Sequence, residues 1–317
     1  MHGTGLRRLG QLQRARPPLL VRGGRVNFSL PLRVRWDLDR KGTPFDAEKA
    51  SAIFSELENT SPLLLEVTVE TEDGLRFLSR RAGEGKIPGR VQVFLGDSVS
   101  PGGHPLPGTD VFFHLKSFTP EDRGRDRPLF WAEYDPGDPD RSLLLLLPLI
   151  EAGEEALVAL RTVNLRKRDN LDPVPPFPDA GYLERFFPLS AGTPGRGPKL
   201  VVHDFFLWEF LSRSKPHLLE GRGEFGGCQG GVTLAYVDWE GSVYPCESYL
   251  VKLGNLLDKS MEEVWGSPER EEVASLVRRT PGKCGECRFY EGCRGGCRGL
   301  SHHFGGGADG ADPQCPF

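Results

Sequence analysis

Seven cysteines are the residues of this 317-residue chain best suited to chemistry, and all of them lie after residue 227. An odd number of thiols cannot pair completely as disulfides within one chain, and a cytosolic setting disfavours disulfides in any case. Thiolates gathered in one region are typical metal ligands instead. The seven are Cys228, Cys246, Cys284, Cys287, Cys293, Cys297 and Cys315.

Their spacing favours iron–sulfur clusters. Cys284 and Cys287 form a Cys-x2-Cys loop, in which two thiolates can converge on one metal ion or on one face of a cluster. With Cys293 and Cys297, four thiolates fall between residues 284 and 297, which is too many for one tetrahedral ion on so short a tether, unless some bind elsewhere. The remote cysteines would then complete two sites, because the thiolates of one run can serve two clusters.

The residues between the cysteines suit a negatively charged cofactor. A cubane held by thiolates carries net negative charge, which neighbouring cations stabilise. Glycines lack a Cβ atom, so backbone amides can approach the cluster sulfurs closely. The interleaving cations are Lys283, Arg288, Arg294 and Arg298, and the glycines are Gly285, Gly292, Gly295, Gly296 and Gly299.

Zinc is the alternative metal. Zinc sites typically use two Cys-x2-Cys pairs separated by about 15–20 residues, or mixed sets of cysteine and histidine. This chain has one Cys-x2-Cys pair, and seven thiols do not divide into two four-cysteine sites. His302 and His303 could supply an eighth ligand, so the zinc alternative stays open at this point.

A family resemblance is carried by these same residues. The order Cys-x(9–15)-Gly-x4-Cys, a gap, Cys-x2-Cys-x5-Cys-x3-Cys, a second gap and a final Cys resembles the SPASM domain. This domain follows the catalytic domain in many radical-SAM enzymes that modify peptides. The resemblance includes every cysteine and about a third of the chain. It extends to Val243–Cys246, Leu253–Asn255, Met261–Trp265 and Cys293–Cys297.

The resemblance implies two auxiliary [4Fe–4S] clusters. One would use Cys228, Cys246 and Cys297. Family members often have a further cysteine upstream of the first motif position, which this chain lacks. The first cluster would therefore keep an open iron or take a non-cysteine ligand. The other cluster would use Cys284, Cys287, Cys293 and Cys315.

The N-terminal half shows the frame of an α/β domain. Strands are predicted at residues 32–38, 63–69, 91–95 and 111–115, with a helix on Ala50, Ile53, Phe54 and Leu57 and another at 73–81. Strands that alternate with short helices favour a largely parallel sheet. Residues 98–108 and 120–141 are predicted loops, 143–147 a buried strand, 154–160 a helix, and 169–181 a connector. A last strand at 199–202 and a helix at 204–212 complete this half.

The same half resembles a radical-SAM partial (β/α) barrel that has lost its chemistry. A radical-SAM enzyme needs Cys-x3-Cys-x2-Cys after the first strand, but residues 39–45 contain no cysteine. The second strand continues as residues 70–74 without the Gly-Gly-Glu motif that binds the amino group of S-adenosylmethionine. We therefore expect no S-adenosylmethionine. A different α/β domain is the alternative.

The C-terminal region has its own local signals. Residues 232–237 and 242–245 flank the turn Asp238–Gly241, which predicts a hairpin. Ser260–Glu263 is a capping box, and Ser267-Pro268 opens a further helix. These signals divide the chain into a basic, poorly ordered tail (1–26), a degenerate radical-SAM-like α/β domain (27–213) and a small α+β SPASM domain (214–317).

Composition narrows the class of partner. The net charge is −4 and the pI about 6.0, so no overall basic field points to nucleic acid. No apolar stretch is long enough to span a membrane, and arginines interrupt every candidate secretory signal. We expect a cytoplasmic protein.

A chain with SPASM clusters and no site for S-adenosylmethionine is similar to the accessory proteins of GeoRSP systems. That resemblance implies an electron-transferring or substrate-binding partner in peptide (RiPP) maturation. Its partners would be an active radical SAM/SPASM enzyme, a PqqD-like protein and a precursor peptide. The alternatives are an enzyme whose open cluster iron binds substrate directly, or a binding module held together by zinc or iron–sulfur.

Overall fold

The computed structural model describes residues 28–85, 89–100, 104, 106–117, 128–167, 177, 180–187, 197–220, 226–307 and 309–315. The predicted basic tail, residues 1–26, lies outside the described residues. So does most of the predicted connector at 169–181.

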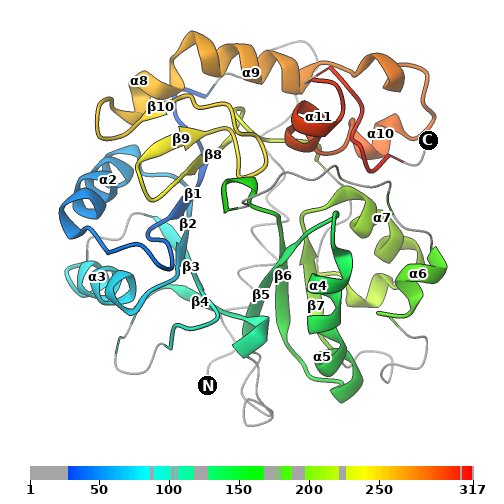
Figure 1. Cartoon of the computed structure of the whole chain (residues 1–317), viewed down its shortest axis with the longest axis horizontal. Coiled ribbons are helices and arrows are strands. Elements are labelled where there is room, and N and C mark those ends of the chain that lie inside the picture. The colour runs from blue at the N-terminus through cyan, green and yellow to red at the C-terminus, as the bar shows by residue number, and fades with distance from the viewer. Residues whose placement is uncertain are drawn as a thin grey trace.

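One sheet runs through the described part of the chain, in the order β10-β9-β8-β1-β2-β3-β4-β5-β6-β7 (Figure 1). Neighbours from β8 through β1 to β7 are parallel, whereas β9 and β10 are antiparallel additions at one end. The strands are β1 (Arg33–Asp37), β2 (Leu64–Val69), β3 (Arg90–Leu95), β4 (Asp110–His114), β5 (Leu129–Tyr134), β6 (Leu157–Thr162), β7 (Lys199–Val202), β8 (Leu234–Val237), β9 (Ser242–Tyr244) and β10 (Gly254–Asn255).

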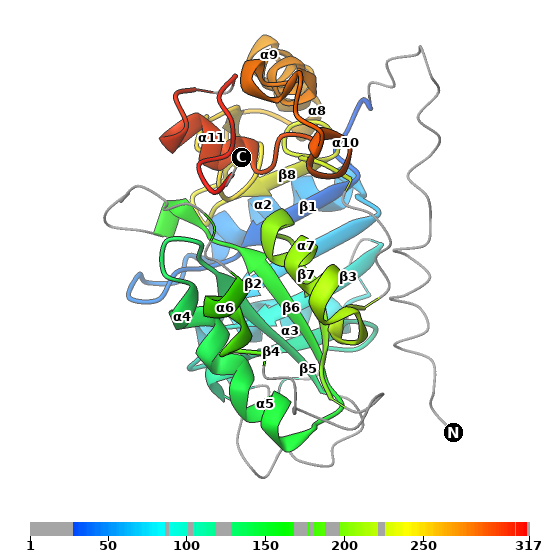
Figure 2. The same ribbon diagram turned by 90° about the vertical axis from the view of Figure 1, so that its right-hand side faces the viewer.

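Helices cover the outer face of the sheet (Figure 1). Helices α2 and α3 lie against the first strands, α4 to α7 lie beside β5–β7, and α8 to α11 lie along the top of both views (Figures 1 and 2). No helix of the described residues is both long and apolar enough to cross a bilayer. The helices are α2 (Ala47–Thr60), α3 (Glu72–Gly83), α4 (Pro139–Leu143), α5 (Leu147–Ala152), α6 (Ala180–Glu184), α7 (Phe205–Ser214), α8 (Met261–Trp265), α9 (Pro268–Arg278), α10 (Tyr290–Cys293) and α11 (Arg298–Phe304).

The alternation along β1 explains how the sheet is used. Successive side chains of a strand point to opposite faces. Val34 and Trp36 are fully buried in the apolar core beneath α2 and α3, where the Trp36 and Phe54 rings lie 6.2 Å apart. The intervening residues, Arg35 and Asp37, therefore point to the inner face of the curved sheet. In β1, the apolar side chains thus face the covering helices, and the charged side chains face the inner side of the sheet.

The structure corrects three predicted segments. Residues 143–147, predicted as a strand, are helical: α4 ends at Leu143, a 3-10 turn follows, and α5 begins at Leu147. The Asp138 side chain accepts the N–H of Arg141 at 3.3 Å, and Pro139 occupies the first turn, which fixes this helical start.

The predicted helix at 154–160 was also wrong, because β6 occupies Leu157–Thr162. This strand hydrogen-bonds to β5 on one side and β7 on the other. Its apolar run is that of a central parallel strand. The predicted loop at 120–141 likewise contains β5 and the start of α4.

Other predicted elements are confirmed. The turn at Asp238–Gly241 joins β8 to β9, with Gly241 at a φ of 81°. Ser260 and Glu263 make both bonds of a capping box, and α9 begins at Pro268. The α/β class with a mostly parallel sheet is confirmed as well. The predicted domain boundary at 213–214 falls at the end of α7 and remains a prediction. Strand β8, beyond that boundary, pairs with β1 of the first half.

Candidate functional site

Three of the seven cysteines lie around the β8–β9 hairpin and α11. Cys228 precedes β8 and Cys246 follows β9, and both pack against the core beneath α2. Cys297 is the N-cap residue of α11. Burial raises the pKa of the Cys297 thiol well above its ordinary value, and the charges of Asp312, Cys246 and Cys228 raise it further. These three thiols are therefore electrostatic neighbours.

The other four cysteines form a second group in the C-terminal segment. Cys284 and Cys293 are buried, and Cys287 and Cys315 are partly buried. Burial raises the pKa of Cys284, and Cys293, Cys315 and Cys287 add to the rise in that order. The N–H of Gly295 points at the Cys293 sulfur, 3.4 Å away, which is the amide approach expected at a cluster.

Thiol groups of this kind fit a bound metal cofactor. A thiolate placed beside others in a buried site is unfavourable without a compensating positive charge, which is why the pKa values rise. Iron reverses this preference, because it binds the deprotonated form. The thiols are not arranged as ligands of a single ion: within the described ranges, no three Cys, His, Asp or Glu side chains form a group that could hold one metal ion.

Sequence reasoning missed one residue that connects the two thiol groups. Asp312 is buried, and its carboxylate accepts the N–H of Cys297 at 2.6 Å and the N–H of Gln314 at 2.9 Å. The N–H of Cys315 in turn donates to the Asp312 carbonyl at 2.9 Å. The acid therefore joins the Cys297 segment to the Cys315 segment. An acidic residue three positions before a cysteine was too weak a signal to single out.

Of the two histidines considered as zinc ligands, His303 is engaged elsewhere. Its Nε2 atom lies 3.2 Å from the backbone nitrogen of Leu250 and accepts its N–H. The ring of His302 packs against Tyr249, with centroids 4.8 Å apart.

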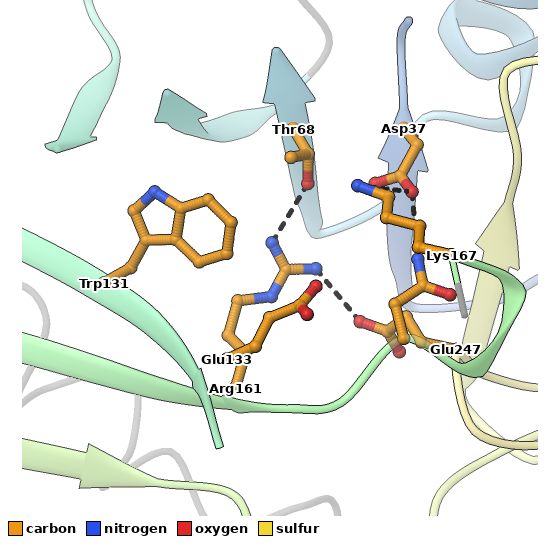
Figure 3. A pocket seen from close by; sticks show the side chains of 8 residues that line it. Asp37, Thr68, Trp131, Glu133, Arg161, Lys167 and Glu247 are labelled. Carbon is orange, nitrogen blue, oxygen red and sulfur yellow. Dashed lines mark hydrogen bonds and ion pairs between the residues drawn. The ribbon is translucent and has the colours of Figure 1, made fainter. Parts of the chain in front are cut away.

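A second polar region lies inside the barrel, where strands from both halves of the chain bring charges together. Arg35 donates to Glu66 at 2.6 Å and to Glu247 at 2.7 Å. Arg161 donates to the same Glu247 oxygen at 2.9 Å and to the Thr68 hydroxyl at 3.1 Å. Figure 3 shows Thr68, Arg161 and Glu247 pointing toward one another from β2, β6 and the segment after β9. We call this set the lumen ion-pair network.

The network continues at the end of β1. Asp37 accepts hydrogen bonds from Asn164 at 3.0 Å and from Tyr236 at 2.8 Å. Lys167 lies 3.1 Å from Asp37 (Figure 3). It also lies 2.6 Å from Glu70. The cavity that these side chains leave has a volume of about 10 Å³, which is space for about one water molecule.

Opposite charges satisfy each other in this network. Burial raises the pKa of Glu66, but Arg33, Arg35 and Arg161 outweigh burial and hold that pKa well below its ordinary value. Glu66 is therefore ionised at neutral pH. The sequence pointed to one part of this network, because Arg33 and Arg35 alternate with apolar residues along the first strand.

The loop after β1 is where a radical-SAM enzyme would carry its catalytic cluster. Here Asp39 is buried and accepts the backbone N–H groups of Glu70 at 2.6 Å and Thr71 at 3.0 Å. Arg40 stacks over the Trp239 ring of the β8–β9 turn at 4.7 Å. The loop is thus fixed to neighbouring elements by a carboxylate and a cation–π contact.

Comparison with known proteins explains the cysteine-rich region. Residues 228–293 match the family model described as SPASM, an iron–sulfur cluster-binding domain. The chain carries a SPASM domain. The match includes five of the seven cysteines, and Cys297 and Cys315 follow it. Binding of iron–sulfur is therefore a property of this region.

Curated relatives resemble this chain over part of their length. The cysteine-type anaerobic sulfatase-maturating enzyme of Clostridium perfringens is 33% identical over 111 residues, 31% of this chain and 30% of that protein. The AdoMet-dependent heme synthase of Oleidesulfovibrio alaskensis is 30% identical over 91 residues, 29% and 23% of the two chains. Mycofactocin maturase MftC of Mycobacterium tuberculosis is 33% identical over 99 residues, 28% and 23%. The chain thus spans less than a third of these relatives' lengths.

A solved structure shows the same fold over nearly the whole chain. Native anSMEcpe with bound AdoMet and the Cp18Cys peptide superposes with a TM-score of 0.53, covering 90% of this chain and 94% of that one. The sequence identity is 13%, so this likeness concerns the fold alone. The expected arrangement of a radical-SAM-like α/β barrel followed by a SPASM region is confirmed.

Proposed function

We propose that this chain is an iron–sulfur accessory protein that carries two [4Fe–4S] clusters and cleaves no S-adenosylmethionine itself. It works beside an active radical SAM/SPASM enzyme in peptide maturation. The observation that carries the proposal is the contrast between the two ends of the fold. Seven thiols gather in two groups in the SPASM region, whereas the barrel has no thiol after β1 and closes its interior with ion pairs.

The thiol groups have the composition that two clusters require. Cys228, Cys246 and Cys297 would hold one, and the four remaining cysteines the other. When bound, such clusters supply one-electron transfer, and the protein tunes them through burial and hydrogen bonds. The chain's own part is to hold the thiolates, to exclude water from the buried sulfurs, and to direct amides such as that of Gly295 at them.

The barrel does not fit S-adenosylmethionine. A site-differentiated cluster needs three thiolates after the first strand, and residues 39–45 offer none. Ligand pockets of small molecules measure about 300–1,000 Å³, far more than the lumen cavity. Opening that cavity would separate Arg161 from Glu247 and Lys167 from Asp37, which leaves buried charges uncompensated.

The relatives support a role in maturation. Two of those described above are named as maturases of a sulfatase and of mycofactocin, and their likeness to this chain is consistent with a shared kind of task. We propose a radical SAM/SPASM enzyme and a PqqD-like protein as partners, with a precursor peptide as the molecule acted on. Electron transfer to the partner enzyme or presentation of the peptide would take place in the cytoplasm.

The test combines this chain with the radical SAM/SPASM enzyme encoded beside it. Each protein, alone and mixed, is reduced with dithionite in the presence of S-adenosylmethionine without oxygen, and 5′-deoxyadenosine is measured. We expect product from the enzyme and the mixture, none from this chain above a cluster-free control, and co-purification of the two proteins. Turnover by this chain alone would refute the assignment, as would the lack of a complex at micromolar concentration.

A further inference from the structure

Arg298 is a charged side chain enclosed within the SPASM region. It follows Cys297 at the start of α11, and it is fully buried. Its Nη2 atom donates to the carbonyls of Leu276 at 3.2 Å and Arg279 at 2.5 Å, and Nη1 donates to the carbonyl of Gly310 at 3.3 Å. The guanidinium therefore links the end of α9 to the C-terminal segment.

The charge of this guanidinium has no ion pair with a carboxylate among the described residues, and its buried Nε atom has no hydrogen-bond partner there. The buried Asp312 carboxylate is engaged instead by the N–H groups of Cys297 and Gln314. A buried cation with so little compensation is costly unless negative charge is supplied nearby.

Both thiol groups adjoin Arg298. It directly follows Cys297 of the three-thiol group. Its Nη1 atom lies 3.5 Å from the position that a Cβ atom on Gly295 would take, and the N–H of Gly295 points at the Cys293 sulfur of the four-thiol group. The side chain thus stands between the two sites, and an anionic cluster in each would supply the missing negative charge.

The other cations of this region differ from Arg298. Lys283, Arg288 and Arg294 are exposed, and Arg294 pairs with Glu291 at 2.7 Å. Solvent and salt screen such surface charges. A buried charge acts at lower effective dielectric and is felt more strongly.

We propose that Arg298 is the counter-charge shared by both cluster sites, and that it sets the reduction potentials of the two clusters together. This inference rests on the proposed presence of two clusters. Reduction adds one electron to a cluster and makes it more negative, so a neighbouring fixed cation favours the reduced form. Removing that cation lowers the potential of every cluster that feels it.

The test is a redox titration of the anaerobic protein, followed by electron paramagnetic resonance, in the wild type and in Arg298→Gln and Arg298→Lys. We expect both midpoint potentials to move to more negative values in Arg298→Gln. They should move less in Arg298→Lys, which keeps the charge. Arg270→Gln is the matched control, because Arg270 is also buried and bonds a backbone carbonyl, that of Trp265, at the opposite end of α9 from the carbonyls that Arg298 binds. It should leave both potentials unchanged.

Iron and acid-labile sulfide are measured first in every preparation, which separates the two proposals. A wild type without sulfide overturns the two-cluster function itself. Full clusters in Arg298→Gln with one potential or neither shifted would overturn the role of Arg298. If Arg298→Gln fails to hold clusters, retention of both by Arg298→Lys supports the need for charge. Loss from Arg298→Lys as well, with Arg270→Gln intact, would assign the residue a purely packing role.

Discussion

The barrel interior and the SPASM region both bury charged side chains, but they differ in how those charges are compensated. In the barrel, each cation of the lumen ion-pair network faces a carboxylate, and Glu247 alone contacts both Arg35 and Arg161. In the SPASM region, the side chain of the buried Arg298 bonds only backbone carbonyls among the described residues, and burial raises the pKa of the Cys284 and Cys297 thiols. The cations of the first interior are compensated by neighbouring carboxylates, and the buried cation of the second is not.

This difference in charge compensation indicates which of the two interiors is better suited to a cofactor. A completed network of ion pairs gains nothing from a ligand and would lose stability if one displaced its members. A bound cofactor would stabilise the SPASM region, because its metal would bind the thiolates and its negative charge would compensate the guanidinium. The buried thiols of the SPASM region therefore offer a better place for a cofactor than the ion pairs of the barrel interior do.

The largest expected effect is loss of one cluster. Replacing both Cys284 and Cys287 by serine removes two thiolates from the four-thiol group and leaves the other group untouched. We expect about eight iron and eight sulfide per chain to fall to about four of each, with one of two paramagnetic signals remaining. Arg288→Gln, an exposed change in the same loop, should keep both clusters. Stoichiometric zinc without sulfide in anaerobic wild type would contradict this picture.

A smaller effect should come from opening the lumen network. Glu66→Gln leaves Arg35 and Arg33 without one of their buried partners, which typically costs about 3–5 kcal/mol. The free energy of unfolding from urea titration is the measurement. Glu240→Gln serves as control, since Glu240 is 58% exposed in its contact with Arg166 and should change stability by less than about 0.5 kcal/mol. Equal losses in the two variants would mean that the network adds nothing.

The smallest effect concerns pH. Burial, with a contribution from Lys116, lowers the pKa of His114 from 6.5 to about 4. The unfolded chain therefore takes up a proton before the folded one as the pH falls, and stability decreases from pH 6.5 downward. Between pH 7.5 and 5.5 this amounts to about 1 kcal/mol.

The corresponding measurement compares urea unfolding of the wild type and His114→Asn at the two pH values. The variant should lose about 1 kcal/mol less than the wild type on going to pH 5.5, because asparagine does not titrate. An identical pH dependence in both proteins would show that His114 is as easily protonated in the folded state as in the unfolded one.

The sequence predicted the SPASM region better than the barrel interior, for a physical reason. Cysteine spacing, the Asp238–Gly241 turn and the capping box at Ser260 are local signals, read within a few residues. The Arg35–Glu247 pair joins residues 212 positions apart, and no local pattern announces such a contact. An arginine in a predicted strand is taken for a solvent-exposed residue, because the curvature of the sheet that buries it is not visible in the sequence.

The two misassigned elements have a similar origin. Residues 143–147 and 156–160 are both short apolar runs, and periodicity alone cannot separate a buried helix from a central strand. The helical start was set by Asp138 and Pro139, outside the apolar run. The strand was set by partners on both sides, β5 and β7.

The pairing of β8 with β1 has a consequence for how the chain reaches its native state. Arg33 and Trp36 in β1 align with Leu234 and Val237 in β8. One edge of β1 therefore stays unpaired until a segment roughly two hundred residues later in the chain has been synthesised. During synthesis the nascent barrel therefore has an unpaired edge, which favours slow closure and invites association with other chains. A ribosome that stopped before residue 234 would release a sheet with that edge still open.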